Sequence, residues 1–458
     1  MKRPNVLFLY TDQQRWDALG ASGNPCIHTP NLDRLASGGV LFENAFCNAP
    51  VCMPSRQSML SGQYPSVVGC TCNGIEMPED ALTVQRILRA SGYRTAQIGK
   101  LHFMNHSDRD HRELHPSYGF DHMLLSDEPG CYDDAYIKWV EMHDPAAVPL
   151  CQASTPPAWT GKPVEAEPRN THEPYLFRGP EGLSHSAFVA DECISFVEQQ
   201  CGSPFFAIGG FYAPHTPLNP PKRFVDLYDI DSLPLPHMNP DDNRLGLSQA
   251  AWRKVKAYYY ALVSHVDDQV GRILDGLERL GIADDTLVLF TSDHGEHLGD
   301  HGRIQKGAPG YDSCSHVPLL MSYAGGFAGG QRHASLVEGV DIVPTILDYC
   351  GVQIPPQLQG RSLRPLLDGK PFEARNSVFI EHRFPFGASW KTVRTREFKL
   401  CASGDGQREL YDLRSDPHEL HNVAGDEQYS ATMADMQAEL VRRWFDVEGQ
   451  YPLRTAQY

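Results

Sequence analysis

The chain has 458 residues, of which 41% are hydrophobic and 21% charged, so it is long enough for one large domain and a smaller one with ample core. The formal net charge of -17 argues against nucleic acid or an anionic membrane as partner, because nothing would offset the repulsion from phosphate groups. No segment is apolar for long enough to span a bilayer, and the run over residues 6–10 is too short for a signal peptide, so we expect a cytoplasmic protein unless a leader has been removed.

The first predicted element is a buried strand over residues 6–11. Its continuous apolar character is typical of a central strand in a parallel sheet that is covered on both faces. Ligands in such folds bind at the carboxyl ends of strands. Asp12 and Gln13 follow this strand directly and therefore stand where a metal or ligand would bind, although a single aspartate there is about as often the polar start of a loop.

A cysteine flanked by prolines defines the next candidate feature, the stretch over residues 50–62. Pro50 and Pro54 are expected to keep the backbone around Cys52 extended. Ser55 would then cap a short helix that begins near Arg56. Cys52 and Arg56 would lie at a helix N-terminus, which favours an anion. Taken alone, however, Cys52 is more often a small buried thiol.

A second strand, predicted over residues 93–98, is followed by Lys100 and His102. With the period-two alternation of an extended chain, both side chains would face the same pocket. The long segment over residues 104–180 shows weak periodicity, and we interpret it as functional loops with a short helix over residues 136–142.

Two further strands have polar residues at their ends. The strand predicted over residues 205–211 leads to His215, which is held between two prolines, and the strand over residues 286–292 leads to Asp293 and His294. Between them, residues 249–280 are apolar at helical spacing and predict a long scaffold helix. Lys306 lies further along the chain. The strand ends are expected to converge on the Cys52 stretch at one edge of one sheet.

The composition changes near residue 371, and short strands are predicted over residues 378–381, 391–395 and 399–402, followed by a helix over residues 429–445. The predicted fold is therefore α/β. A large, mostly parallel sheet flanked by helices occupies residues 1–370, and a smaller α+β subdomain with an antiparallel sheet occupies residues 371–458.

The run Cys52-Met53-Pro54-Ser55-Arg56 resembles the C-x-P-S-R signature of type I sulfatases. Further motifs of that family match in the same order: T-P-N-L-D-R-L-A over residues 29–36, F-E-N-A-F over residues 42–46, G-K-x-H over residues 99–102, P-H-x-P over residues 214–217, and E-L-Y-D-L over residues 409–413. The resemblance implies an alkaline-phosphatase-like fold and hydrolysis of a small-molecule sulfate ester. It also implies a maturation enzyme that oxidises Cys52 to formylglycine, whose hydrate is the nucleophile.

The resemblance also implies a role for each site residue. One divalent cation would be held by Asp12, Gln13, Asp293, His294 and the modified Cys52. Many relatives have Asp where Gln13 stands, so Ca²⁺ is expected while Mn²⁺ and Mg²⁺ stay open. Arg56 and Lys100 would orient the nucleophile and bind sulfate. His102, His215 and Lys306 would contact sulfate, with a histidine protonating the leaving oxygen.

Two alternatives stay open at this point. A phosphonate monoester hydrolase or phosphodiesterase of the same superfamily shares the C-x-P-S-R loop and the Asp-Gln pair, but it lacks the lysine and histidine that stand here at Lys100 and His102. A non-catalytic binding protein on an enzyme scaffold would not need every charged residue of the site. The sequence does not show which alcohol the sulfate group is attached to, and sulfated sugars, choline sulfate and aryl sulfates are all candidate substrates. It does not show the oligomeric state either.

Overall fold

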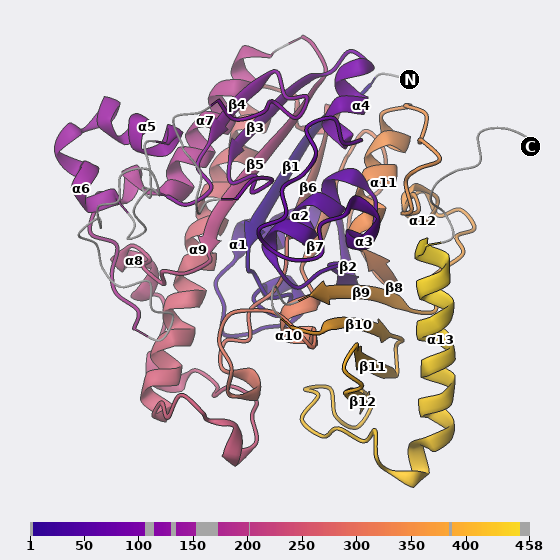
Figure 1. Cartoon of the computed structure of the whole chain (residues 1–458). Coiled ribbons are helices and arrows are strands. Elements are labelled where there is room, and N and C mark those ends of the chain that lie inside the picture. The colour runs from indigo at the N-terminus through magenta and orange to yellow at the C-terminus, as the bar shows by residue number, and fades with distance from the viewer. Residues whose placement is uncertain are drawn as a thin grey trace, which may run out of the picture.

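A large mixed sheet and a small antiparallel sheet form the frame of the protein, seen here in a computed structural model that describes residues 3–105, 114–129, 134–152, 173–200, 202–383 and 387–448 (Figure 1). The large sheet has eight strands in the order β4-β3-β5-β1-β6-β7-β2-β8. These strands are β1 (Asn5–Asp12), β2 (Val40–Phe46), β3 (Arg94–Gly99), β4 (His122–Leu125), β5 (Phe205–Pro214), β6 (Thr286–Ser292), β7 (Leu319–Ser322) and β8 (Gln331–Glu338).

Parallel pairing brings the ends of the central strands to one edge of the large sheet. β1 lies between β5 and β6 and is parallel to both, and β3 is parallel to β5. β7 is antiparallel to its neighbours β6 and β2. The predicted mostly parallel sheet is confirmed, and its strands predicted at residues 6–11, 93–98, 205–211 and 286–292 correspond to β1, β3, β5 and β6.

Helices cover both faces of this sheet, as the continuous apolar runs require. In β1, Leu7 and Leu9 pack on one face, while Val6, Phe8 and Tyr10 pack on the other. The helices are α1 (Pro30–Gly38), α2 (Cys52–Ser61), α3 (Pro65–Val68), α4 (Val84–Ala90), α5 (Ala135–His143), α6 (Val148–Cys151), α7 (His185–Gln199), α8 (Lys222–Val225), α9 (Gln249–Arg279), α10 (Asp312–Ser315), α11 (Ile342–Tyr349), α12 (Arg364–Leu367) and α13 (Ser430–Glu448).

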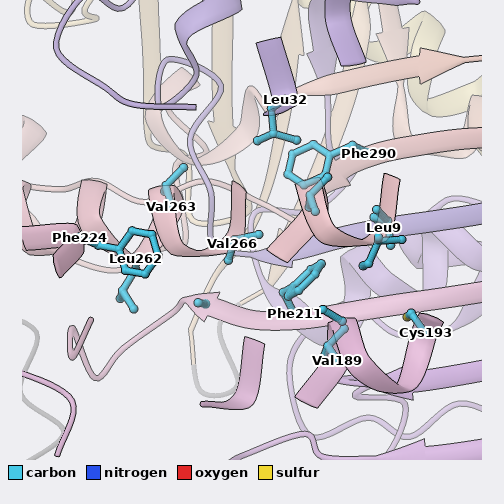
Figure 2. Packing of buried hydrophobic residues seen from close by; sticks show 14 of the residues in the cluster. Leu9, Leu32, Val189, Cys193, Phe211, Phe224, Leu262, Val263, Val266 and Phe290 are labelled. Atoms are coloured by element: carbon cyan, nitrogen blue, oxygen red, sulfur yellow. The ribbon is translucent and has the colours of Figure 1, made fainter. Parts of the chain in front are cut away.

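The face that carries Leu9 packs against α7 and α9. Figure 2 shows Val189 and Cys193 of α7 and Val266 of α9 beside Leu9 and Phe211 of the sheet, all of them buried. The opposite face is covered by α2, α4 and α11, whose buried apolar residues join the second cluster. Burial of this kind contributes about 25 cal/mol per Å² of apolar surface. The long helix predicted over residues 249–280 is confirmed as α9.

The smaller sheet is antiparallel, with the order β12-β11-β10-β9. Its strands are β9 (Val378–Arg383), β10 (Ser389–Arg394), β11 (Phe398–Ser403) and β12 (Arg408–Asp412), and α13 runs beside them (Figure 1). The predicted C-terminal antiparallel sheet and its helix are therefore confirmed. Of the segment predicted as loops, residues 106–113, 130–133 and 153–172 lie outside the described residues, and α5 matches the short helix expected there. Among the described helices, none is both long and apolar enough to cross a membrane.

A buried polar network ties α13 to the main domain. The guanidinium of Arg443 donates to Glu338 Oε1 at 2.8 Å and to the Tyr64 hydroxyl at 2.6 Å. Arg375 pairs with the other oxygen of Glu338 at 2.9 Å. Burial alone would raise the pKa of Glu338, but the two guanidinium groups lower it overall. The carboxylate is therefore held charged inside the protein.

Arg443→Ala is expected to lower the free energy of unfolding by about 3 kcal/mol, because it leaves a buried carboxylate with one of its two cationic partners. Urea unfolding at neutral pH measures this change. Arg442→Ala is the matched control, since Arg442 is exposed and pairs with Glu439 and Asp446 at the surface. This substitution should lower the free energy of unfolding by about 1 kcal/mol or less. Equal losses in the two variants would contradict the assignment.

Candidate active site

Two carboxylates lie side by side at the carboxyl edge of the large sheet. Asp12 ends β1 and Asp293 directly follows β6, and the register pairs Thr11 with Ser292 just before them. The backbone amide of Asp293 donates to the carbonyl of Thr11 at 3.2 Å. In the described part of the chain, single ligand atoms of Asp12, Cys52, Asp293 and His294 lie within 4.8 Å of one another, and all four residues are buried. The predicted convergence on the Cys52 stretch is present for these residues.

Cys52 is the first residue of α2, so the expectation of an extended backbone around it is wrong. Val51 caps the helix, and Pro54 fits into the first turn because a backbone N–H there has no partner within the helix. Ser55 does not cap; its hydroxyl donates to the carbonyl of Asp293 from inside the helix. The predicted position of Cys52 at a helix N-terminus is nevertheless present.

The Cys52 thiol lies among charged groups. Its Sγ is 3.0 Å from Lys306 Nζ, 3.2 Å from His294 Nε2 and 3.8 Å from Asp12 Oδ1. Burial and Asp12 would raise the pKa of this thiol, but Lys306 and His294 outweigh them and the pKa falls below its ordinary value. The ammonium of Lys306 would also stabilise an anionic oxygen at this position.

Arg56 bridges the two carboxylates. Its Nε donates to Asp293 Oδ2 at 2.7 Å and its Nη2 to Asp12 Oδ2 at 3.1 Å, and its side chain is completely buried. The pair of carboxylates is thereby neutralised in part without a metal. The other two oxygens, Asp12 Oδ1 and Asp293 Oδ1, each lie 3.7 Å from His294 Nε2. Asp293 Oδ1 also accepts from the backbone amides of Gln13 and His294, at 3.0 and 2.8 Å.

Lys100 reaches the same place from the end of β3. Its Nζ lies 2.8 Å from Asp12 Oδ2 and 3.9 Å from Glu128 Oε1, with no exposed surface. Burial would lower the pKa of Lys100, but Asp12 and Glu128 raise it above its ordinary value, so the side chain is an ammonium. Its backbone approaches β5 so closely that a Cβ on Gly210 would lie 2.2 Å from the Lys100 carbonyl oxygen. A glycine at that position is therefore required.

His102 does not continue an extended chain. β3 ends at Gly99, and His102 has a left-handed φ of 57°, so the period-two alternation expected for Lys100 and His102 is wrong. The backbone amide of His102 donates to Asp127 Oδ1 at 2.9 Å. A contact of His102 with sulfate stays a prediction.

His215 stands at the mouth of a cavity next to these groups. Its Nδ1 donates to the carbonyl of Thr216 at 2.8 Å, and its Nε2 makes no hydrogen bond with the described residues. Burial and the nearby Lys306 lower the pKa of His215 well below its ordinary value, so the free protein holds a neutral imidazole. The cavity is lined by His215 and by aromatic and polar side chains that include Tyr136, Phe177, Tyr212 and Asn219.

Gln13 and Lys306 meet beside Cys52. Gln13 Oε1 accepts from Lys306 Nζ at 2.8 Å, and Gln13 Nε2 donates to the buried carboxylate of Glu296. Sequence reasoning singled out Asp293 and His294 but not Glu296, although it stands three residues after Asp293. His382 of β9 was also missed: it is buried, and burial together with the charge of His294 lowers its pKa to about 4.

The donor set fits a hard divalent cation. His294 Nδ1 lies 2.8 Å from the carbonyl of Gly295, which can only accept, so Nδ1 carries the proton and Nε2 offers a lone pair. Two carboxylate oxygens and the amide oxygen of Gln13 complete the set. Oxygen ligands of this kind suit Ca²⁺, Mg²⁺ and Mn²⁺.

Comparisons with known proteins agree with this geometry. The family model described as sulfatase matches residues 4–352, and that for the C-terminal part of N-sulphoglucosamine sulphohydrolase matches residues 299–444. An arylsulfatase of Clostridium perfringens is 30% identical over 477 residues, covering 98% of this chain and 95% of that protein.

Two other similar proteins differ in chemistry. An N-acetylglucosamine-6-O-sulfatase of Bacteroides thetaiotaomicron is 27% identical, covering 98% of this chain and 87% of that protein. The crystal structure of a phosphonate monoester hydrolase of Agrobacterium radiobacter superposes with a TM-score of 0.84 at 27% identity, covering 98% of this chain and 96% of that one.

Proposed function

The chain belongs to the sulfatase family, and on that premise we propose that it hydrolyses a sulfate ester at Cys52, oxidised to formylglycine, beside one divalent cation. The observation that carries this proposal is the buried group of Asp12, Asp293 and His294 around the Cys52 side chain. Its fold is the alkaline-phosphatase-like fold expected from the sequence.

Each group has a task that follows from its position. When present, the formylglycine hydrate supplies the attacking hydroxyl and the cation neutralises sulfuryl oxygens. Asp12, Gln13, Asp293 and His294 would hold the cation, which we expect to be Ca²⁺, with Mn²⁺ and Mg²⁺ as alternatives. Arg56 fixes the two carboxylates, as its bonds to both indicate.

Lys100, Lys306 and the histidines serve the sulfate group. Lys306 Nζ lies 3.0 Å from the Cys52 side chain, so it would stabilise charge on the nucleophile and on a sulfuryl oxygen. Lys100 adds a second buried ammonium on the opposite side of Asp12. We assign sulfate contacts to His102 and His215. A histidine protonates the leaving oxygen, and His215, which is neutral in the free protein, can do so only once the bound sulfate anion has raised its pKa and Nε2 carries a proton.

The alcohol part of the substrate is assigned to the cavity that begins at His215. Its lining combines aromatic rings, such as Tyr136 and Phe177, with hydrogen-bonding groups, such as Asn219. Such a mixture suits a hydroxylated ring, and the similarity to an N-acetylglucosamine-6-O-sulfatase supports a sulfated sugar. Screening sulfated sugars, choline sulfate and aryl sulfates for released sulfate tests this assignment; preference for choline sulfate would overturn it.

The alternative function is hydrolysis of phosphonate monoesters, which the structural similarity to such an enzyme favours. Protein co-expressed with a formylglycine-generating enzyme should be assayed with an aryl sulfate and the matching aryl phosphonate. A higher kcat/KM for the sulfate ester is expected. A higher value for the phosphonate would move the function to the alternative, and no turnover of either would indicate a binding protein.

Ca²⁺ should stabilise the protein measurably. A ligand that binds only the folded state at 100 times its Kd adds about 2.7 kcal/mol of stability, so the melting temperature of chelator-treated protein should rise when Ca²⁺ is added. Differential scanning calorimetry measures the shift. Asp293→Ala is expected to abolish it, and an unchanged shift in this variant would contradict the proposed ligand set.

A further inference from the structure

Glu296 is a buried carboxylate that contacts two parts of the site at once. It lies in the loop after β6 and has 3% of its surface exposed. Its Oε2 accepts a hydrogen bond from Gln13 Nε2, and its Oε1 accepts from the backbone amides of Leu298, at 3.1 Å, and Gln305. Each oxygen therefore has a distinct task.

The two neighbours of the Gln13 amide determine which way it points. A carboxylate accepts hydrogen bonds and an ammonium only donates them. Glu296 on one side therefore requires the NH₂ group, and Lys306 on the other side, at 2.8 Å, requires the oxygen. The reversed amide would place NH₂ against Lys306 and oxygen against Glu296, and both contacts would be repulsive.

The other oxygen of Glu296 holds the loop that carries Lys306. Leu298 and Gln305 have left-handed φ values of 51° and 65°, a conformation that costs free energy for residues other than glycine. The backbone amides of these two residues donate the hydrogen bonds that Glu296 Oε1 accepts. The loop therefore takes a constrained path between Glu296 and Lys306, and one carboxylate fixes both of the groups that flank Cys52 on this side.

We propose that Glu296 is a positioning residue that directs the Gln13 oxygen to the cation and holds Lys306 beside Cys52. This inference rests on the proposed metal site. It also explains a glutamine at position 13: a carboxylate there would face the carboxylate of Glu296 without a donor between them. Glu296 touches neither the substrate nor the cation in this proposal.

Glu296→Gln tests the inference with little change of shape. The new amide keeps an oxygen for Leu298 and Gln305, but it turns an NH₂ group toward Gln13, whose own amide must then rotate and present NH₂ to the cation. Ca²⁺ affinity, measured by isothermal titration calorimetry on chelator-treated protein, is expected to fall by about 10- to 100-fold. Glu338→Gln, another buried glutamate that accepts a backbone amide, should leave the Ca²⁺ affinity unchanged.

Exchanging the two side chains separates positioning from a merely structural role. In the variant Gln13→Glu/Glu296→Gln, the amide at position 296 donates to the carboxylate at position 13, and an oxygen again faces the cation and Lys306. Ca²⁺ affinity should recover to within a few-fold of the wild type. Wild-type affinity in Glu296→Gln, or no recovery in the exchanged variant, would overturn the inference. A wild-type protein that binds none of Ca²⁺, Mn²⁺ and Mg²⁺ would instead refute the proposed metal site.

Discussion

Cys52→Ala is expected to lower turnover of a sulfate ester by at least about 10⁴-fold, because it removes the thiol that must be oxidised to give the formylglycine nucleophile. The structure places no second nucleophile of the described chain so close to Lys306 and His294, which lie 3.0 and 3.2 Å from the Cys52 Sγ. Any residual activity would come from the lysine side chains and the metal-bound site acting without the nucleophile. Single-turnover assays with an aryl sulfate measure the loss.

Cys47 provides the matched control. It is buried and precedes Cys52 by five residues, but burial raises the pKa of its thiol, and its Sγ donates to the carbonyl of Cys314 at 3.8 Å. Cys47→Ala should keep turnover near that of the wild type. The intact mass of protein made with the maturation enzyme should fall by the difference between a CH₂SH and a CHO group. Full activity in protein whose mass shows an unmodified cysteine would contradict the assignment.

The central strands could be predicted because burial on both faces leaves a plain signal. β1, β5 and β6 are continuous apolar runs, and polar residues mark their ends. β2 and β8 were not predicted. β8 alternates between exposed and half-buried residues over most of its length, and β2 carries half-buried Glu43 and Asn44 in its middle. Near the edge of a sheet, hydrogen bonding to a neighbouring strand determines whether a segment becomes a strand. The spacing of residues in the sequence does not show which segment that neighbour is.

The predicted start of the helix near Arg56 is four residues too far along the chain, because tertiary packing outweighs the local preferences of the sequence. Two prolines and a serine favour a helix that starts after Ser55. The structure starts it at Cys52, and all ten residues of α2 are buried. The serine hydroxyl that would have capped the helix bonds the Asp293 carbonyl. Packing of the whole helix against the sheet outweighs the preference of its first turn.

Most of the site could be located from strand ends, but the contacts within it could not. Asp12, Lys100 and Asp293 were found because each follows a strand of one parallel set. Glu296 was missed because its importance depends on Gln13, which lies 283 positions away in the chain. Motifs and their spacing show which residues lie at the carboxyl edge of the large sheet. Hydrogen-bond partners within the site depend on the paths of loops with left-handed residues, which cannot be predicted from the sequence.

Lys100→Ala is expected to lower the rate on a sulfate ester by about two orders of magnitude or more. The ammonium of Lys100 is completely buried and lies 2.8 Å from Asp12, so its charge acts in a medium of low dielectric constant. A contact of this kind that strengthens in the transition state is worth about 2 to 4 kcal/mol. The loss should be smaller for a phosphonate ester if Lys100 selects sulfate.

Loss of a buried lysine also destabilises a protein, so the effect on rate must be separated from the effect on folding. Lys399 of β11 is the matched control, because it is equally buried and lies 2.8 and 2.7 Å from Asp312 and Glu419. Lys399→Ala should lower the melting temperature by a similar amount while the folded fraction keeps its kcat. Comparing kcat per folded molecule in the two variants therefore isolates the contribution of Lys100 to catalysis. Near-normal sulfate turnover in folded Lys100→Ala protein would contradict its role and favour phosphonate hydrolysis instead.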